Sequence, residues 1–432
     1  MNFSSLYLNP PPLRNILPSE VLNGIIQPSK LLLDNELSLH YFKSDSSDIV
    51  KIVFTIAAGI AFQEFPFVAN LTNNGLIEGS KNKKGKEIAN IFDFYGVQIR
   101  TYTDLNNAII SVNFLKKYTK EIIPLISEIV QDPAFRKEEI EVIFEQKIKE
   151  LTIDSQKVKP IAIKKLQEML FGSGNPLGVI GTIEDVNSIN TKTLQDFYNK
   201  HYNNKLCIYS ASNSSDLLLE TLNSSIINKG KNHNAISIPS LKMLSSENKK
   251  EYIYKQDALQ SAIAIGCKSI SKTHPDFARL NVLITLLGGY FGSRLMNNLR
   301  ENKAYTYGIS AFTIDQCNLS YIMITTEVRS QITTEALKEI YYEINKLKNE
   351  IVNIEELERV KNYILGRFLR GMDSVYRQVD LWIDLQKFNM DFSYFQDYLS
   401  QIIETTPEDI LKLANIYLQE DKLYEVVAGI KQ

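Results

Sequence analysis

Three asparagines, Asn70, Asn73 and Asn74, are spaced i, i+3 and i+4 in the segment that begins at Pro66. On a helix these three side chains project from one face. In the same frame, His-x-x-Glu-His would supply two imidazoles for Zn²⁺ and a carboxylate as general base toward a zinc-bound water. An asparagine amide is neutral, is a weak zinc ligand and cannot accept a proton near pH 7. The spacing is therefore that of a zinc site, but the residue types cannot perform its chemistry.

The residues after these asparagines resemble a family of zinc peptidases. The run EGSK at 78–81, followed by KEI at 86–88, resembles the phrase that follows the zinc helix of the pitrilysin/insulinase family. That family takes a third ligand, a glutamate, about 76 residues after its second histidine, and Glu150 stands at this distance from Asn74. The resemblance implies a degenerate metal site that binds no metal, at Asn70, Asn73, Asn74 and Glu150. Alternatively, the asparagines are a polar face near a helix start, where Asn caps well, and Glu150 is a solvated helix carboxylate.

The second half of the chain contains a motif suited to holding a peptide. The run SRLMNNLRENKAYTYG at 293–308 resembles the family phrase S-R-L-x-x-x-[LV]-R-E-x-x-G-L-x-Y. In that family the later Arg and the Tyr contact the substrate, so the resemblance implies substrate-binding roles for Arg300 and Tyr307. A guanidinium and a phenol are strong donors for a peptide carbonyl, or for the oxyanion that forms from it. Arg294 is interpreted as structural.

Alternatives remain open for this motif. Ala304 replaces the Gly of the family phrase and Tyr305 replaces its Leu, and a bulkier turn could shift the Tyr307 hydroxyl. From residue types alone, Arg300 could be a helix-surface cation paired with Glu301. Tyr307 could be an ordinary strand aromatic in a chain with 22 tyrosines.

The elements that would position these residues occur twice in the chain. Four residues of the first half recur 209 positions later: Pro66, Ala69, Leu71 and Gly79 match Pro275, Ala278, Leu280 and Gly288. Strand-like runs precede and follow each copy, at 48–59, 97–103 and 108–114 and again at 261–267, 306–313 and 320–327. Helical periodicity then follows in both halves, at 119–130, 138–152 and 161–170, and at 334–347 and 354–369. The order of elements indicates one unit present twice.

This order of strands followed by helices predicts an α+β fold with an antiparallel-leaning sheet in each half. The expected organisation is two homologous α/β-sandwich domains. We place the N-terminal peptidase-like domain at 1–224 and the C-terminal one, which carries the Arg/Tyr motif, at 251–432. Residues 225–250, rich in Asn and Lys and without apolar periodicity, are predicted to be the linker.

Composition excludes several classes of function. A net charge of −2 and a pI near 6.2 give no electrostatic basis for binding nucleic acid or an anionic membrane. The longest apolar runs are far below the roughly 20 residues of a transmembrane helix, and no signal peptide is visible. The three cysteines and four histidines are isolated: Cys207, Cys267, Cys317, His40, His201, His233 and His274. The cytoplasm is the expected compartment, with the periplasm as the alternative.

Together these features predict a non-catalytic, substrate-binding subunit of a two-component zinc peptidase. The expected partner is a homologous zinc-peptidase subunit, in a heterodimer or a larger assembly. Zinc is expected only in that partner, and no cofactor is expected in this chain. The alternative is a catalytically inactive scaffold or binding protein that keeps the fold and has no role in proteolysis. A self-sufficient peptidase with another metal site would need a ligand cluster, and no other His, Cys or carboxylate group has the spacing.

Overall fold

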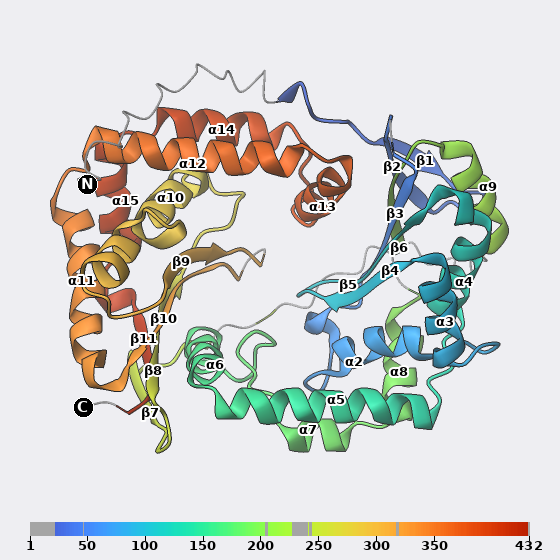
Figure 1. Cartoon of the computed structure of the whole chain (residues 1–432), viewed down its shortest axis with the longest axis horizontal. Helices are drawn as coiled ribbons and strands as arrows, with labels where there is room; N and C mark the ends of the chain where they lie inside the picture. Colours follow the sequence, from blue (N-terminus) through green and yellow to red (C-terminus); the bar gives the residue numbers. More distant parts are fainter. Residues whose placement is uncertain are drawn as a thin grey trace, which may run out of the picture.

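A computed structural model describes residues 22–45, 47–203, 206–226, 241, 244–316 and 319–430, in which two sheets are flanked by helices (Figure 1). The expectations for the first 21 residues, for His233 and Cys317, and for most of the linker lie outside these ranges. The domain boundary at 225–250 therefore stays a prediction.

The first half forms a six-stranded sheet in the order β1-β2-β6-β3-β5-β4. Its central strand β3 carries the run IVKIVFTI, in which β-branched residues dominate and all but the first residue are buried. β3 is antiparallel to β5 and β6, whereas β2 and β6 are parallel. The strands are β1 (Ser29–Leu32), β2 (Ser38–Lys43), β3 (Ile49–Ile56), β4 (Gln98–Thr103), β5 (Ala108–Leu115) and β6 (Leu206–Ser212).

The second half repeats this topology in a five-stranded sheet, in the order β7-β11-β8-β10-β9. Its central strand β8 is antiparallel to β10 and β11, and β7 and β11 are parallel. The helices after the central strands, α2 (Val68–Gly75) and α10 (Phe277–Ile284), begin 209 positions apart, which is the offset of the sequence repeat. The repeat and the antiparallel-leaning α+β fold are confirmed. The strands are β7 (Lys250–Tyr254), β8 (Gln260–Lys268), β9 (Ile309–Ile314), β10 (Tyr321–Arg329) and β11 (Tyr424–Gly429).

Helices of each half cover one face of that half's sheet, where the largest apolar clusters lie. In the first half they are α2, α3 (Gly85–Tyr95), α4 (Thr119–Gln131), α5 (Lys137–Gln156), α8 (Thr191–His201) and α9 (Ser215–Ser225), and the short helix α7 (Ile183–Ser188) packs on α5. In the second half they are α10, α11 (Thr333–Asn349), α12 (Ile354–Met372), α14 (Tyr394–Glu404) and α15 (Pro407–Tyr417). Short 3₁₀ turns lie at Ile60–Phe62, Leu76–Glu78, Lys116–Tyr118, Ser330–Ile332 and Glu420–Lys422, and π-helical turns at Thr285–Gly289 and Met296–Asn302.

The other face of each sheet is covered by a helix from the opposite half (Figure 1). Helix α6 (Val158–Phe171) packs on β8 and β11, and its Leu166 and Leu170 share a core with Ala264 and Val426. Helix α13 (Val375–Gln386) packs on β2 and β6, where Trp382 and Val379 share a core with Phe42. Because α6 and α13 bury apolar side chains on these second faces, the two halves cannot separate without exposing those apolar surfaces.

Polar contacts reinforce the docking of α13 and the residues around it on the first half. The Lys51 ammonium of β3 donates to the Tyr376 carbonyl oxygen at 2.8 Å and pairs with the Asp380 carboxylate. The Lys51 side chain is only 8% exposed, so this pair supplies its counter-charge in a buried place. Trp382 Nε1 donates to His40 Nδ1 at 3.2 Å.

One strand begins later than the sequence predicts. The run 306–313 was expected to be extended throughout, but β9 begins at Ile309. The Thr306 hydroxyl accepts the Gly308 N–H at 3.0 Å and donates to the Glu327 carbonyl at 2.8 Å. Because the Thr306 hydroxyl bonds these backbone groups, they are not available for pairing with a neighbouring strand, and β9 begins only after them. Threonine hydroxyls commonly compete with sheet hydrogen bonds in this way.

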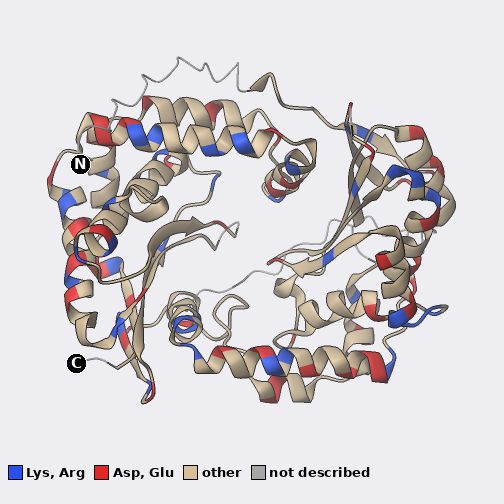
Figure 2. Cartoon of the chain, viewed as in Figure 1, with Lys and Arg blue, Asp and Glu red and all other residues tan. Residues whose placement is uncertain are grey.

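Surface charges of both signs are mixed along α5 and along the helices at the opposite edge of the molecule (Figure 2). No helix of the described residues is long and apolar enough to cross a membrane.

The Lys51–Asp380 pair gives a stability prediction. Asp380→Ala leaves a buried ammonium without its counter-charge, so the free energy of unfolding should fall by about 1–3 kcal/mol. Urea denaturation measures this change. The matched control is Asp45→Ala, because the Lys43–Asp45 pair joins side chains that are 73% and 85% exposed. That control should change stability by less than about 0.5 kcal/mol. Equal effects of the two variants would contradict the structural role of the buried pair.

Candidate functional site

Asn73, at the position that a catalytic base would occupy, is fully buried in α2 and holds neighbouring elements together. Its Nδ2 donates to the carbonyl oxygens of Tyr102 at 2.9 Å and Ile109 at 3.0 Å, in β4 and β5. Its Oδ1 accepts from the Tyr202 hydroxyl, at the end of α8, at 3.2 Å. Burial raises the pKa of Tyr202 well above its usual value, so the phenol remains protonated and donates. A carboxylate at position 73 would face two carbonyl oxygens and be repelled by them.

Asn70 and Asn74 lie on the same helix and are bonded to each other. Asn74 Nδ2 donates to Asn70 Oδ1 at 3.4 Å, and the Thr101 hydroxyl donates to Asn74 Oδ1 at 2.9 Å. Helix α2 begins after Phe67, and no side chain caps its N-terminus. None of the three asparagines therefore caps the helix, although they share one face near its start, as the alternative interpretation expected.

Glu150 lies on α5, which packs against α2. Its side chain is 58% exposed, and both of its oxygens accept from the Lys147 ammonium, at 3.0 and 3.1 Å. In the part of the chain that the structure describes, the recorded partner of Glu150 is Lys147 and not one of the three asparagines. This geometry agrees with the interpretation of Glu150 as a solvated helix carboxylate.

The donor set at these positions does not fit zinc. At the ligand positions, the Asn74 amide donates to Asn70 Oδ1 and accepts from the Thr101 hydroxyl, and the Glu150 carboxylate is held by an ammonium. Zinc sites are built from imidazole, thiolate and carboxylate ligands. Within the described ranges, no three His, Cys, Asp or Glu side chains cluster closely enough to hold a metal ion.

Arg300 and Tyr307 lie along one groove of about 1220 Å³. Its walls come from both halves: residues 156–158 at the junction of α5 and α6, and from the second half residues 255–260, 300–307 and 327–331. Tyr307 is 92% exposed, and Leu259 in the same groove is 90% exposed. Exposed apolar side chains beside hydrogen-bond donors are what an extended peptide needs for binding.

Arg300 sits on the π-helical turn Met296–Asn302, a kind of turn found often at functional sites. Its guanidinium stacks on the Phe291 ring, with 4.6 Å between Cζ and the ring centroid. It also makes an ion pair with Glu301 at 3.4 Å, which the alternative interpretation of this residue expected. Its side chain remains 35% exposed, so guanidinium donors are left for a ligand in the groove.

The departure at Ala304 has a structural consequence. Ala304 adopts φ 51°, in the left-handed region, where glycine is accommodated without steric cost. The alanine therefore carries backbone strain, but it still makes the turn that leads to Tyr307. The Tyr305 N–H donates to the Leu299 carbonyl at 2.8 Å and closes this turn.

Two features of the site escape sequence reasoning. The sequence could not predict that Asn73 donates to the backbone carbonyls of Tyr102 and Ile109, because every residue has the same backbone carbonyl group. Phe291, which stacks on Arg300, lies before the family phrase at 293–308, so the phrase did not include this aromatic partner.

The burial of Asn73 gives a second prediction. Asn73→Ala leaves two carbonyl oxygens and one hydroxyl without their partner, so unfolding free energy should fall by about 2–4 kcal/mol. Thermal or urea denaturation measures this change in the free energy of unfolding. Asn70→Ala, on the same helix but half-buried, is the control and should cost less than about 1 kcal/mol. A neutral Asn73→Ala variant would show that the buried amide is not a structural link.

Comparison with known proteins finds family models that match each half of the chain. The insulinase (peptidase family M16) model matches residues 42–177, and the peptidase M16 inactive domain model matches residues 188–364. The chain is 23% identical to the non-peptidase homolog YmxG of Helicobacter pylori over 379 residues, covering 84% of this chain and 85% of that protein. It is 22% identical to the probable inactive metalloprotease YmfF of Bacillus subtilis over 415 residues, covering 90% and 95%.

The fold is similar to the crystal structure of a peptidase M16 inactive domain from Pseudomonas fluorescens, with a TM-score of 0.81 and 21% identity. The match covers 94% of this chain and 98% of that one. Other similar proteins, from Rickettsia species, are described as uncharacterized zinc proteases. The chain belongs to the insulinase family, peptidase family M16, as a homologue without the His-x-x-Glu-His sequence.

Proposed function

We propose that this protein is the non-catalytic, substrate-binding subunit of a two-component zinc peptidase of the M16 family. A homologous partner subunit supplies the zinc, the activated water and the general base. Arg300 and Tyr307 of this chain hold the peptide and donate to its scissile carbonyl. The observation that carries the proposal is the position of both donors along one groove in a chain whose Asn73 has no capacity for base catalysis.

The chemistry of the groove supports a role in binding. An oxyanion is stabilised by donors that are oriented before the reaction begins. The Arg300 guanidinium is oriented by Phe291 and Glu301, so part of the cost of ordering it is met before a peptide arrives. Tyr307 is highly exposed and follows a closed turn, which presents its hydroxyl to the groove side of the chain. The names of two relatives, a non-peptidase homolog and a probable inactive metalloprotease, also favour a non-catalytic chain.

The isolated chain should bind no stoichiometric zinc and hydrolyse no unfolded peptide, because its ligand positions hold amides. Metal analysis after dialysis against zinc should give well below one equivalent per chain. Stoichiometric zinc together with chelator-sensitive cleavage by the pure chain would falsify the proposal. Activity without bound metal would indicate contamination and is tested by repeating the assay after a second purification step.

Mixing the chain with a His-x-x-Glu-His homologue from the same genome should create peptidase activity. If Arg300 and Tyr307 act as oxyanion donors, Arg300→Ala and Tyr307→Phe should each lower kcat by about 10²–10³. If they only position the peptide, KM should rise while kcat stays constant. Tyr254→Phe is the matched control, because Tyr254 is 64% exposed and lies outside the groove.

The outcomes of the mixing experiment separate the two candidate functions. Full activity of the Arg300→Ala/Tyr307→Phe double variant would exclude the proposed donor roles. A stable complex that never cleaves peptides, whichever homologue is added, would favour an inactive scaffold instead.

A further inference from the structure

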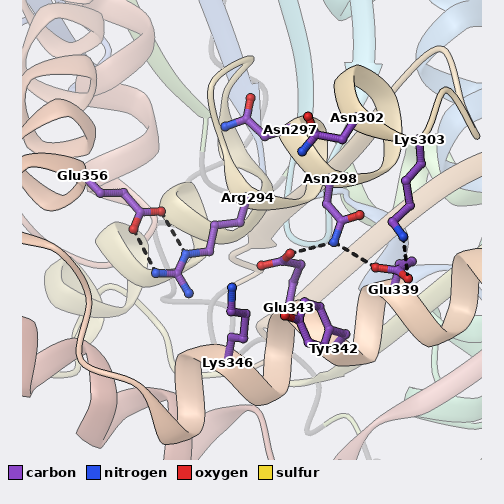
Figure 3. A pocket seen from close by; sticks show the side chains of 10 residues that line it. All are labelled: Arg294, Asn297, Asn298, Asn302, Lys303, Glu339, Tyr342, Glu343, Lys346 and Glu356. Carbon is purple, nitrogen blue, oxygen red and sulfur yellow. Dashed lines mark hydrogen bonds and ion pairs between the residues drawn. The ribbon is translucent and has the colours of Figure 1, made fainter.

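A second pocket, of about 580 Å³, lies between the turn Met296–Asn302, α11 and the first turn of α12 (Figure 3). Polar and charged side chains dominate its lining. The lining residues are Arg294, Asn297, Asn298, Asn302, Lys303, Glu339, Tyr342, Glu343, Lys346 and Glu356.

Two ion pairs neutralise four of these charges. Arg294 donates through Nε and Nη2 to the two oxygens of Glu356, both at 2.8 Å, and this confirms its structural role. The pKa of Arg294 is raised overall. Burial by itself would lower this pKa, but the hydrogen bonds from Arg294 to Glu356 and the negative charges of Glu356 and Glu343 outweigh that effect. Lys303 pairs with Glu339 at 2.9 Å. The charges left in the lining are Glu343 and Lys346.

Glu343 is a buried carboxylate with no cation bound to it. The residue is 7% exposed, and its recorded hydrogen bond comes from Asn298 Nδ2, at 2.7 Å from Oε1. Among the described residues, no ammonium or guanidinium lies within ion-pair distance of it. Lys346, one turn away, instead places its ammonium 5.3 Å from the centroid of the Tyr342 ring. Arg294 and Lys346 share the lining, and the charge of Glu343 acts on Arg294, but neither cation makes a direct ion pair with Glu343. A cation bound directly to this buried carboxylate would therefore compensate its burial.

Asn298 adds a second unsatisfied group in the same lining. Asn298 is 8% exposed, and its Nδ2 donates to the carboxylates of both Glu339 and Glu343. These two bonds fix the orientation of the amide, because a flipped amide would direct its oxygen toward two carboxylates. Its Oδ1 is buried and has no hydrogen-bond donor among the described residues. The lining thus combines an acceptor without a donor and a buried carboxylate without a direct ion pair.

We propose that this pocket binds a primary ammonium group, with Glu343 as its counter-charge. The ammonium belongs to a peptide, either at its free N-terminus or on a lysine side chain. A guanidinium fits less well, because a bidentate pair would have to share the Glu343 Oε1 atom with Asn298, whereas a primary ammonium needs only one carboxylate oxygen. A divalent metal ion fits less well, because the Asn298 amide points hydrogens at the two carboxylates. The half-exposed Tyr342 ring can cover the carbon chain that carries the ammonium.

The pocket is adjacent to the groove described above. The turn Met296–Asn302 lines the pocket through Asn297, Asn298 and Asn302, and lines the groove through Arg300 and Glu301. A peptide anchored by its ammonium in the pocket would therefore contact the same turn that carries Arg300. The ammonium site does not depend on the proposed peptidase role, since it can be measured on the isolated chain.

Calorimetric titration of the full chain at low ionic strength tests the site with three tetrapeptide amides. Ala-Ala-Ala-Ala-amide carries only an N-terminal ammonium, N-acetyl-Ala-Ala-Lys-Ala-amide carries only a lysine ammonium, and N-acetyl-Ala-Ala-Ala-Ala-amide carries neither. At least one of the first two should bind, and the one that binds identifies the source of the ammonium. The third peptide should not bind.

Glu343→Gln should weaken binding of the ammonium peptide by about tenfold or more, as the loss of a charged hydrogen bond predicts. Tyr342→Arg, at a 52% exposed position, adds a cation at the pocket and should also weaken binding. Glu335→Gln is the control, since Glu335 is an exposed residue of α11 outside the lining. Equal binding of all three peptides, or unchanged binding in a folded Glu343→Gln variant, would overturn the proposal. So would binding of Mg²⁺ or Ca²⁺ that depends on Glu343 while no ammonium peptide binds.

Discussion

The exchange of one helix between the two halves is the packing constraint on which the rest of the structure depends. Each sheet has apolar residues on both faces, and its own helices cover only one of them. Helix α6 buries the second face of one sheet and α13 buries that of the other. Because burial of apolar surface is the main stabilising term in folding, this exchange fixes how the halves face each other. The groove with Arg300 and Tyr307 is a direct result, since residues next to α6 form one of its walls.

Asn73 has a structural role at a position whose spacing suits a zinc helix. Its amide joins α2 to β4, β5 and the end of α8. An amide both donates and accepts, whereas an ionised carboxylate only accepts. The surroundings of position 73 require two donated hydrogen bonds, so they favour an amide over a carboxylate.

The turn Met296–Asn302 lines both the groove and the second pocket. Its side chains alternate between two cavities, so Arg300 reaches the groove while Asn298 reaches the carboxylates of α11. The bidentate Arg294–Glu356 pair fixes the start of this segment against α12. The two proposed binding sites therefore share one turn whose start is fixed by this ion pair.

Local patterns in the chain were enough to predict the α+β class, the internal repeat and many of the strands and helices, because apolar periodicity and turn residues are local signals. Side-chain types alone also show that amides at residues 70, 73 and 74 are unsuited to zinc chemistry. Long-range packing, by contrast, places α6 and α13 on the opposite halves, brings Asn73 to two strand carbonyls and buries Glu343 without a direct ion pair. These depend on contacts between residues far apart in the chain, and a long-range contact leaves no mark on the local pattern from which a single sequence is read.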